Sequence, residues 1–171
     1  LLFWSGSLQA DPGKSRATRV SHLGEATELV VESYQGEADV EVELAEAAGT
    51  YVFDTDPAIR AAGLTGNLAN DLGLKAFYSG ASYLTAEHPA EHPLVTGFRV
   101  LDELPLREKP LARLLRERSI GTLESEKRAI EINPEQLRQR LKLEGDQRAT
   151  LLLTRIGQRE VAILAERCEG N

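Results

Sequence analysis

The chain has 171 residues, 42% of them hydrophobic, and a formal net charge of -7 at pH 7. This length supports one hydrophobic core of ordinary size or two small ones. No run approaches the roughly 18 apolar residues that cross a bilayer, so no membrane partner is expected. The single cysteine, Cys168, excludes a disulfide framework and a cysteine-based zinc site, which predicts a cytoplasmic location.

The start of the chain indicates that it continues a longer protein. It begins with Leu1, contains no methionine, and opens with LLFWSG, which is typical of the interior of a strand. We expect the C-terminal part of a larger protein whose main activity is carried by the preceding part.

Charge is unevenly distributed along the chain. Residues 1–105 carry 6 Lys and Arg against 16 Asp and Glu, and residues 106–171 carry 14 against 11. The two balances, -10 and +3, predict two units with different surroundings.

Four strands are predicted in the first 50 residues, arranged as two pairs. Residues 1–8 and 16–23 flank a loop rich in turn residues, and residues 28–34 and 38–44 are joined across Gln35-Gly36-Glu37. The alternating VEVEL of the fourth strand is typical of a strand with one exposed face.

The stretch YVFDTDPAIRAAGL, residues 51–64, has two interpretations. A short strand can lead into a helix over residues 58–74, with Asp56 as N-cap, Pro57 in the first turn and Gly73 as the stop. Alternatively, Asp54 and Asp56 can form the nucleophile and acid/base pair of a magnesium-dependent phosphatase of the haloacid-dehalogenase type. That chemistry needs a lysine and a further acidic cluster, but only Lys75 is nearby, so the capped helix is favoured.

Two other motifs are candidates for chemistry. Asp56-Pro57-Ala58 imitates the acidic-proline motif of a methyltransferase sheet, but residues 1–55 contain no G-x-G to hold the cofactor. In EHPAEHP, His88 and His92 with their neighbouring glutamates can form a metal site in a loop, although an exposed proline-rich loop is the favoured interpretation. His22 is expected to be structural.

The last 75 or so residues predict a β-α-β-α-β-β unit. A strand in GFRVLDEL precedes a helix in LARLLRER, and a strand over residues 122–132 precedes a helix that Asn133 caps, with Pro134 at its first position. A hairpin follows, with strands 149–156 and 159–167 joined at Gly157-Gln158 by a type II′ turn. The fold class is therefore α+β.

Basic residues of this unit are candidates for phosphate contacts in a nucleic-acid complex. Their alternative is a solvated face with ion pairs to nearby glutamates. The candidate nucleic-acid-binding residues are Lys127, Arg128, Arg138, Arg140, Lys142, Arg148 and Arg155.

Five stretches in order resemble the C-terminal half of a bacterial family. They are YVFDTDPAIRAAGL, YLTAEHP, GFRVLDELPL, GTLESEKRAIEINPEQLRQRLKL and ATLLLTR, covering about residues 51–167. They are similar to class I S-adenosylmethionine-dependent methyltransferase-like proteins that end in a THUMP-like domain. Two positions depart from the pattern: Glu124 and Glu126 precede Lys127-Arg128, where a more basic stretch is expected, and Ala129 stands where glycine is common.

The resemblance implies an accessory, substrate-binding region that is not catalytic alone. LLFWSGS and RATRVSH resemble the last two strands of a methyltransferase sheet, which implies three segments: residues 1–50 as the end of that sheet, 51–95 as a link, and 96–171 as the THUMP-like domain. The implied partners are RNA, with tRNA as the usual substrate of THUMP domains, and the upstream methyltransferase domain, which would hold S-adenosylmethionine. The alternative is a protein-interaction or oligomerisation module, such as a homodimer, that binds no nucleic acid.

Overall fold

The computed structural model describes residues 13–22 and 29–168. Its strands are β1 (Ser15–His22), β2 (Leu29–Gly36), β3 (Tyr51–Thr55), β4 (Lys75–Ala76), β5 (Tyr83–Ala86), β6 (Val95–Pro105), β7 (Ile120–Lys127), β8 (Gln147–Ile156) and β9 (Arg159–Arg167). Its helices are α1 (Pro57–Ala61), α2 (Thr65–Leu72), α3 (Glu108–Glu117) and α4 (Pro134–Leu141).

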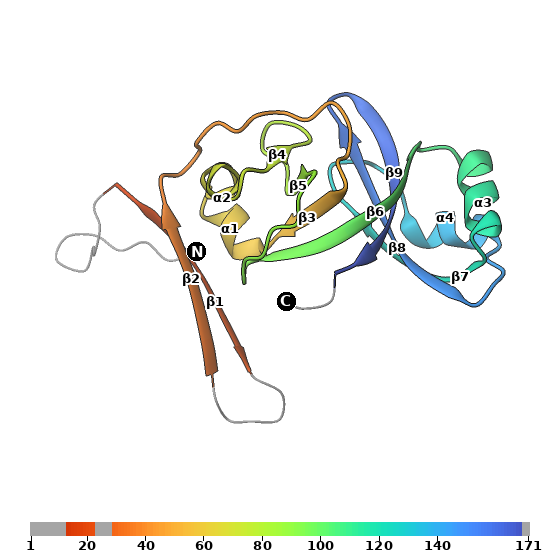
Figure 1. The fold of residues 1–171 in the computed structure, drawn as a ribbon, viewed down its shortest axis with the longest axis horizontal. Helices are drawn as coiled ribbons and strands as arrows, with labels where there is room; N and C mark the ends of the chain where they lie inside the picture. The colour runs from red at the N-terminus through yellow and green to blue at the C-terminus, as the bar shows by residue number, and fades with distance from the viewer. Residues whose placement is uncertain (1–12, 23–28, 169–171) are drawn as a thin grey trace.

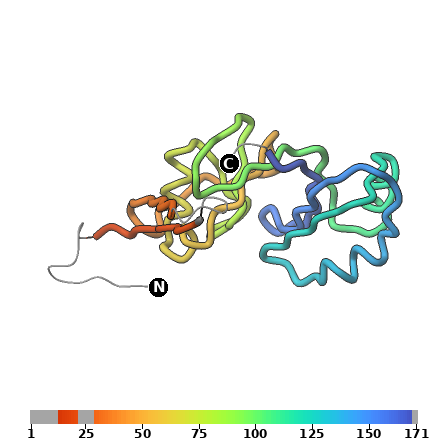
Figure 2. The backbone as a smooth tube through the Cα atoms, turned by 90° about the horizontal axis from the view of Figure 1, so that it is seen from below, coloured from red at the N-terminus to blue at the C-terminus, as the bar shows by residue number. Residues whose placement is uncertain are grey.

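One seven-stranded sheet with the order β4-β5-β3-β6-β9-β8-β7 runs through the molecule, and β1 and β2 form a separate antiparallel pair (Figure 1). Among the strands of the described residues, only β7 and β8 pair in parallel, because α4 carries the chain back between them. The long strand β6 pairs with β3 through Val95–Arg99 and with β9 through Phe98–Pro105. It therefore joins a front part (β1–β5, α1, α2) to a back part (α3, α4, β7–β9), and the two lie along the long axis in Figure 2.

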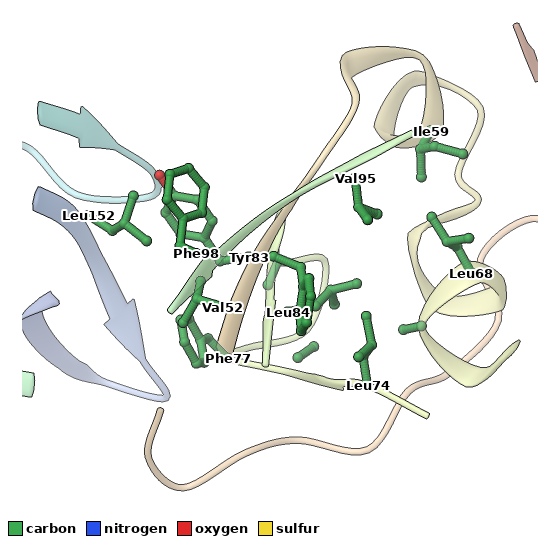
Figure 3. Packing of buried hydrophobic residues seen from close by; sticks show 14 of the residues in the cluster. Val52, Ile59, Leu68, Leu74, Phe77, Tyr83, Leu84, Val95, Phe98 and Leu152 are labelled. Carbon is green, nitrogen blue, oxygen red and sulfur yellow. The ribbon is translucent and has the colours of Figure 1, made fainter. Parts of the chain in front are cut away.

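Strands β8 and β9 are buried on both faces. Leu152, Ile163 and Ala165 pack against the front part, and Figure 3 shows Leu152 beside Phe98 and Tyr83. The alternate residues Leu151 and Leu153, together with Ala162 and Leu164 of β9, pack under α3 and α4. This explains the continuous apolar runs in these strands, since neither face is left to water.

The predicted α+β class is confirmed. The β-α-β-α-β-β order predicted for the last 75 or so residues is also confirmed, as β6-α3-β7-α4-β8-β9. Asn133 caps α4, since its side-chain oxygen accepts a hydrogen bond from the N–H of Gln136 at 3.1 Å. Gly157 has a φ of +57°, as the first residue of a type II′ turn requires.

The predicted single helix over residues 58–74 is wrong. The structure has two helices, α1 and α2, because Gly63 takes a left-handed φ of +69° and reverses the chain between them. The predicted start and stop are confirmed: Asp56 caps α1, with Pro57 in its first turn, and Gly73 ends α2 at a φ of +67°.

The predicted pairing of residues 28–34 with 38–44 is also wrong. β2 pairs with β1, and residues 38–44 form no strand beyond one bridge, between Leu44 and Ala76. This segment is held by single backbone bonds, such as Asp39 N–H to the Gly63 carbonyl at 2.8 Å. The first predicted strand, residues 1–8, lies outside the described residues, and the limits of the three predicted segments stay a prediction.

The strand predicted over residues 122–132 ends earlier, at Lys127. Ala129 then has a φ of +56°, in the left-handed region that favours glycine. This turn ends the ladder and leads into the N-cap of α4, and its backbone conformation is one that glycine adopts without steric cost.

Gly66→Ala should destabilise the chain, because the added Cβ would lie 1.9 Å from the backbone carbonyl oxygen of Val40. Alanine favours a helix by about 1 kcal/mol over glycine, but moving a packed backbone costs about 1–3 kcal/mol, so we expect a net loss of up to about 2 kcal/mol. Urea unfolding measures the loss. Gly97→Ala is the matched control, since its Cβ would meet its nearest atoms at an ordinary 3.6 Å; an equal loss there would contradict the packing argument.

Candidate nucleic-acid interface

The structure divides the seven predicted basic residues among three places. Arg138, Arg140 and Lys142 lie on or just after α4, and Arg148 lies near the start of β8. Lys127, Arg128 and Arg155 lie at the C-terminal ends of the parallel strands β7 and β8. All are exposed except Arg128 and Arg155, which are half-buried. The residues therefore do not form one patch, and each group has its own surroundings.

The α4 group is on the outer face of a helical layer formed by α3 and α4. The inner faces of these helices bury Leu111 and Leu115 of α3 and Leu137 and Leu141 of α4 against the sheet. This leaves the charged side chains of both helices to solvent. The outer face of the layer is accordingly polar and built on rigid elements.

Within the described part of the chain, Arg138 and Lys142 form no ion pair, whereas Arg140 lies 3.1 Å from Glu108 of α3. Lys142 follows the last turn of α4 with a left-handed φ of +48°. Two of the three cations are thus free to meet an anion.

Sequence reasoning missed the basic residues of α3 and its flanks. Residues 107–118 carry five cations, Arg107, Lys109, Arg113, Arg116 and Arg118, against two glutamates. Arg113 pairs with Glu117 at 2.7 Å and Arg118 with Asp102 at 2.5 Å, but the other three have no ion pair among the described residues. The charge excess of this segment was readable from the sequence, but only the packing of α3 beside α4 brings it next to Arg138 and Lys142.

Arg128 is placed differently, in a cluster at the junction of the front and back parts. Its guanidinium donates to the carboxylate of Asp54 at 2.8 Å, lies 3.8 Å from Glu126, and covers the ring of Tyr83 at 5.5 Å. Arg60 lies 3.5 Å from the other oxygen of Asp54. We call Asp54, Arg60, Tyr83, Glu126 and Arg128 the junction cluster.

Burial dominates the electrostatics of this cluster. It raises the pKa of Asp54, an effect that Arg128 and Arg60 oppose and Glu126 reinforces. Burial also raises the pKa of Tyr83, with Glu126 and Asp54 acting in the same direction. Burial alone would lower the pKa of Arg128, but its anionic neighbours outweigh it, so the guanidinium stays charged.

The two aspartates of the YVFDTDPAIRAAGL stretch face different groups. Asp54 belongs to the junction cluster, whereas Asp56 accepts from the N–H of Ala58 at 2.8 Å and lies 3.7 Å from Arg19. The two carboxylates pair with different arginines, Asp54 with Arg60 and Arg128 and Asp56 with Arg19. Within residues 13–22 and 29–168, no group of three or more His, Cys, Asp or Glu side chains is arranged to hold a metal.

His88 and His92 also have separate structural contacts. The ring of His88 lies 3.3 Å from the carbonyl of Leu72, and His92 accepts from the N–H of Leu94 at 3.1 Å. Burial lowers the pKa of His92, although nearby carboxylates oppose this shift. The exposed-loop interpretation fits Glu87–Pro89 and Glu91, whereas Ala90 packs against the core and the half-buried His92 ring meets the Tyr34 ring edge-on at 5.6 Å. None of the helices in the described part has the length and apolar character needed to span a bilayer.

The geometry of the back part agrees with a known family. Residues 95–167 match the THUMP domain-like family. This range begins at β6 and ends with β9, so it covers the whole β-α-β-α-β-β arrangement.

Two curated relatives are uncharacterized S-adenosylmethionine-dependent methyltransferases from two strains of Mycobacterium tuberculosis. Each is 34% identical over 110 residues, which is 64% of this chain and 30% of the relative. A crystal structure of a proposed methyltransferase from Porphyromonas gingivalis matches 89% of this chain and 38% of its own, with a TM-score of 0.70 and 20% identity. The chain thus spans about a third of the length of these proteins, and the predicted similarity to methyltransferases with a THUMP-like domain is confirmed.

The raised pKa of Asp54 predicts how its contribution to stability varies with pH. A carboxyl group whose folded pKa lies above its ordinary value of 3.8 stabilises the fold below that value, and this contribution is lost as pH rises through the folded pKa. The advantage of the parent over Asp54→Asn should therefore shrink with rising pH, by about 1.4 kcal/mol per unit of pKa shift. Urea unfolding of both proteins from pH 3 to 7 measures this, and an advantage that grows with pH would contradict the assigned direction.

Proposed function

We propose that this chain is the accessory, substrate-binding region of an S-adenosylmethionine-dependent methyltransferase, that it acts in the cytoplasm, and that it binds RNA through the outer face of the helical layer. The match of residues 95–167 to the THUMP domain-like family and the similarity to methyltransferases support the association with that enzyme class. The charges of α3 and α4 support the outer face of the helical layer as the binding surface.

The observation that carries the proposal is the charge of this layer in an acidic protein. Residues 107–118 and 133–142 together hold eight cations and three carboxylates, whereas the whole chain has a net charge of -7. Cations without ion pairs on both helices offer contacts to successive phosphates, because phosphate binding depends on charge and spacing. An acidic front part would in turn repel the backbone and direct it to this layer.

The described residues do not fit S-adenosylmethionine. Such a cofactor needs a glycine-rich turn between a strand and a helix, and the connection from β3 to α1 is Asp56 followed by Pro57. We therefore assign the cofactor, and the reaction itself, to the part of the longer protein that the relatives have beyond this match.

Charge reversal of α4 tests the RNA-binding surface. Arg138→Glu with Lys142→Glu should weaken binding of tRNA or a single-stranded oligonucleotide, because two phosphate contacts become repulsive. The slope of log K against log salt should fall by about 1 for each lost contact. Fluorescence anisotropy at several salt concentrations gives both values.

The matched control reverses two cations on the opposite part of the molecule. Lys14→Glu with Arg16→Glu makes the same change in net charge near the start of β1. We expect this variant to bind RNA nearly as well as the parent. Equal affinity of the parent and the α4 variant would overturn the proposed surface, and absence of binding by the parent would overturn the RNA function.

A second candidate function, a protein-interaction module, is favoured by the β1–β2 hairpin. Val20 and Val31 are cross-strand partners that stay 58% and 62% exposed, and Leu29 beside them is 55% exposed. The opposite face of the hairpin packs on the body through Ala17 and Tyr34. We propose the remaining part of the longer protein as the occupant, because the relatives are about three times as long as the matched region.

Replacing both valines tests this apolar face. Val20→Thr with Val31→Thr keeps the branched shape that favours strands but removes apolar surface. The parent chain should be monomeric by light scattering and should bind the dye ANS more strongly than the variant. Equal dye binding would contradict an accessible apolar face, and a parent dimer that the variant dissociates would replace domain docking by a homodimer.

A further inference from the structure

Tyr78 and Arg155 form a second pair at the junction, beside the junction cluster. The guanidinium carbon of Arg155, near the end of β8, lies 4.3 Å from the centre of the Tyr78 ring, and both side chains are half-buried. A backbone hydrogen bond next to the pair keeps the two residues together, because Gly157 in the β8–β9 turn donates its N–H to the carbonyl of Phe77 at 2.8 Å. The stack thus joins the segment after β4 to the end of the β8–β9 hairpin.

The two arginine–tyrosine pairs at the junction differ in charge balance. Arg128 over Tyr83 is neutralised by Asp54 and Glu126, as buried structural arginines usually are. Arg155 has no ion pair among the described residues: its printed hydrogen bond goes to the carbonyl of Gly157 at 3.3 Å. Glu160 is its register partner across the hairpin, but the two side chains form no ion pair. If the Arg155–Tyr78 pair served only to join the front and back parts, the charge of Arg155 would not need to stay without a neutralising carboxylate.

Lys127 is a second cation without an ion pair among the described residues, and it lies on the same sheet face as Arg155. It is the register partner of Leu153 in the parallel pair β7–β8, so the strand alternation puts Lys127, Leu153 and Arg155 on one side of the sheet. Leu153 packs under α3 and α4, which identifies this side as the one that the helical layer covers. The exposed amine of Lys127 donates only to the carbonyl of Ile132, at 2.9 Å, within the described part.

These three side chains have the chemistry of a phosphate site. Stacking on an aromatic ring fixes the plane of a guanidinium and leaves its N–H edge to bind two phosphate oxygens, and a neighbouring ammonium adds a point charge. We propose that Arg155, oriented by Tyr78, and Lys127 bind a backbone phosphate of the RNA, so that the RNA contact extends from the helical layer as far as the junction. This inference rests on the proposed RNA function and adds a residue of the front part to its surface.

The test is RNA binding by the full chain with a graded set of variants. Arg155→Ala should weaken binding roughly tenfold and lower the salt slope by about 1. Arg155→Lys should weaken it nearly as much, because lysine keeps the charge but loses the planar fork. Tyr78→Phe keeps the ring and should bind like the parent, whereas Tyr78→Leu should lose affinity with little change in salt slope.

Arg99→Ala is the matched control, because Arg99 lies on β6 outside the proposed surface and is already paired with Glu166 at 2.5 Å. Thermal unfolding of each variant separates a loss of fold from a loss of contact, and Arg155→Lys preserves charge if Arg155→Ala proves unstable. Parent-like affinity and salt slope of folded Arg155→Ala, together with loss of binding by the α4 double variant, would overturn this site and leave the RNA function intact. Failure of the parent chain to bind RNA would overturn both.

Discussion

The fold depends on two strands that have no solvent face. Residues of β8 and β9 point alternately into a core with the front part and a core under α3 and α4. Leu151, Leu152 and Leu153 are consecutive and all fully buried, yet they belong to different cores. Because both cores share these strands and β6 hydrogen-bonds to both parts, the two parts are joined by a continuous backbone ladder. A one-residue change of register in β8 would exchange the residues of both cores at once.

This shared sheet brings the ends of β7 and β8 against the front part, and it explains the position of Asp54. The residue has no capping role, but it lies where Arg128 arrives from the back part. A buried ion pair adds little net stability because both charges lose water, whereas removing one partner leaves the other uncompensated. The junction cluster therefore restricts how the two parts can meet more than it strengthens the fold. It also removes Arg128 from the set of cations free to bind phosphate.

The separation of charge along the sequence becomes a separation in space. The basic helices lie on one side of the sheet at one end of the molecule, as Figure 1 shows for α3 and α4, while the acidic segment that contains Glu41 and Glu43 borders the edge strand β4. Glu124 and Glu126, which depart from the basic pattern of the resembling family, alternate with Lys127 and so lie on the opposite sheet face. Glu126 belongs to the junction cluster, where it accepts from Tyr83 at 3.4 Å, and neither glutamate adds acidity to the outer face of the helical layer.

The sequence by itself determined the local features: the N-caps at Asp56 and Asn133, the hairpin turn at Gly157 and the β-α-β-α-β-β order, because capping and turn chemistry act over a few residues. It also identified the basic residues of α4 and the likeness to THUMP-like proteins. Only the tertiary structure decided that β1 pairs with β2, that Asp54 meets Arg128, 74 residues away, and that Tyr78 lies under Arg155. These contacts depend on how the sheet brings distant strand ends together, and no local pattern encodes that distance.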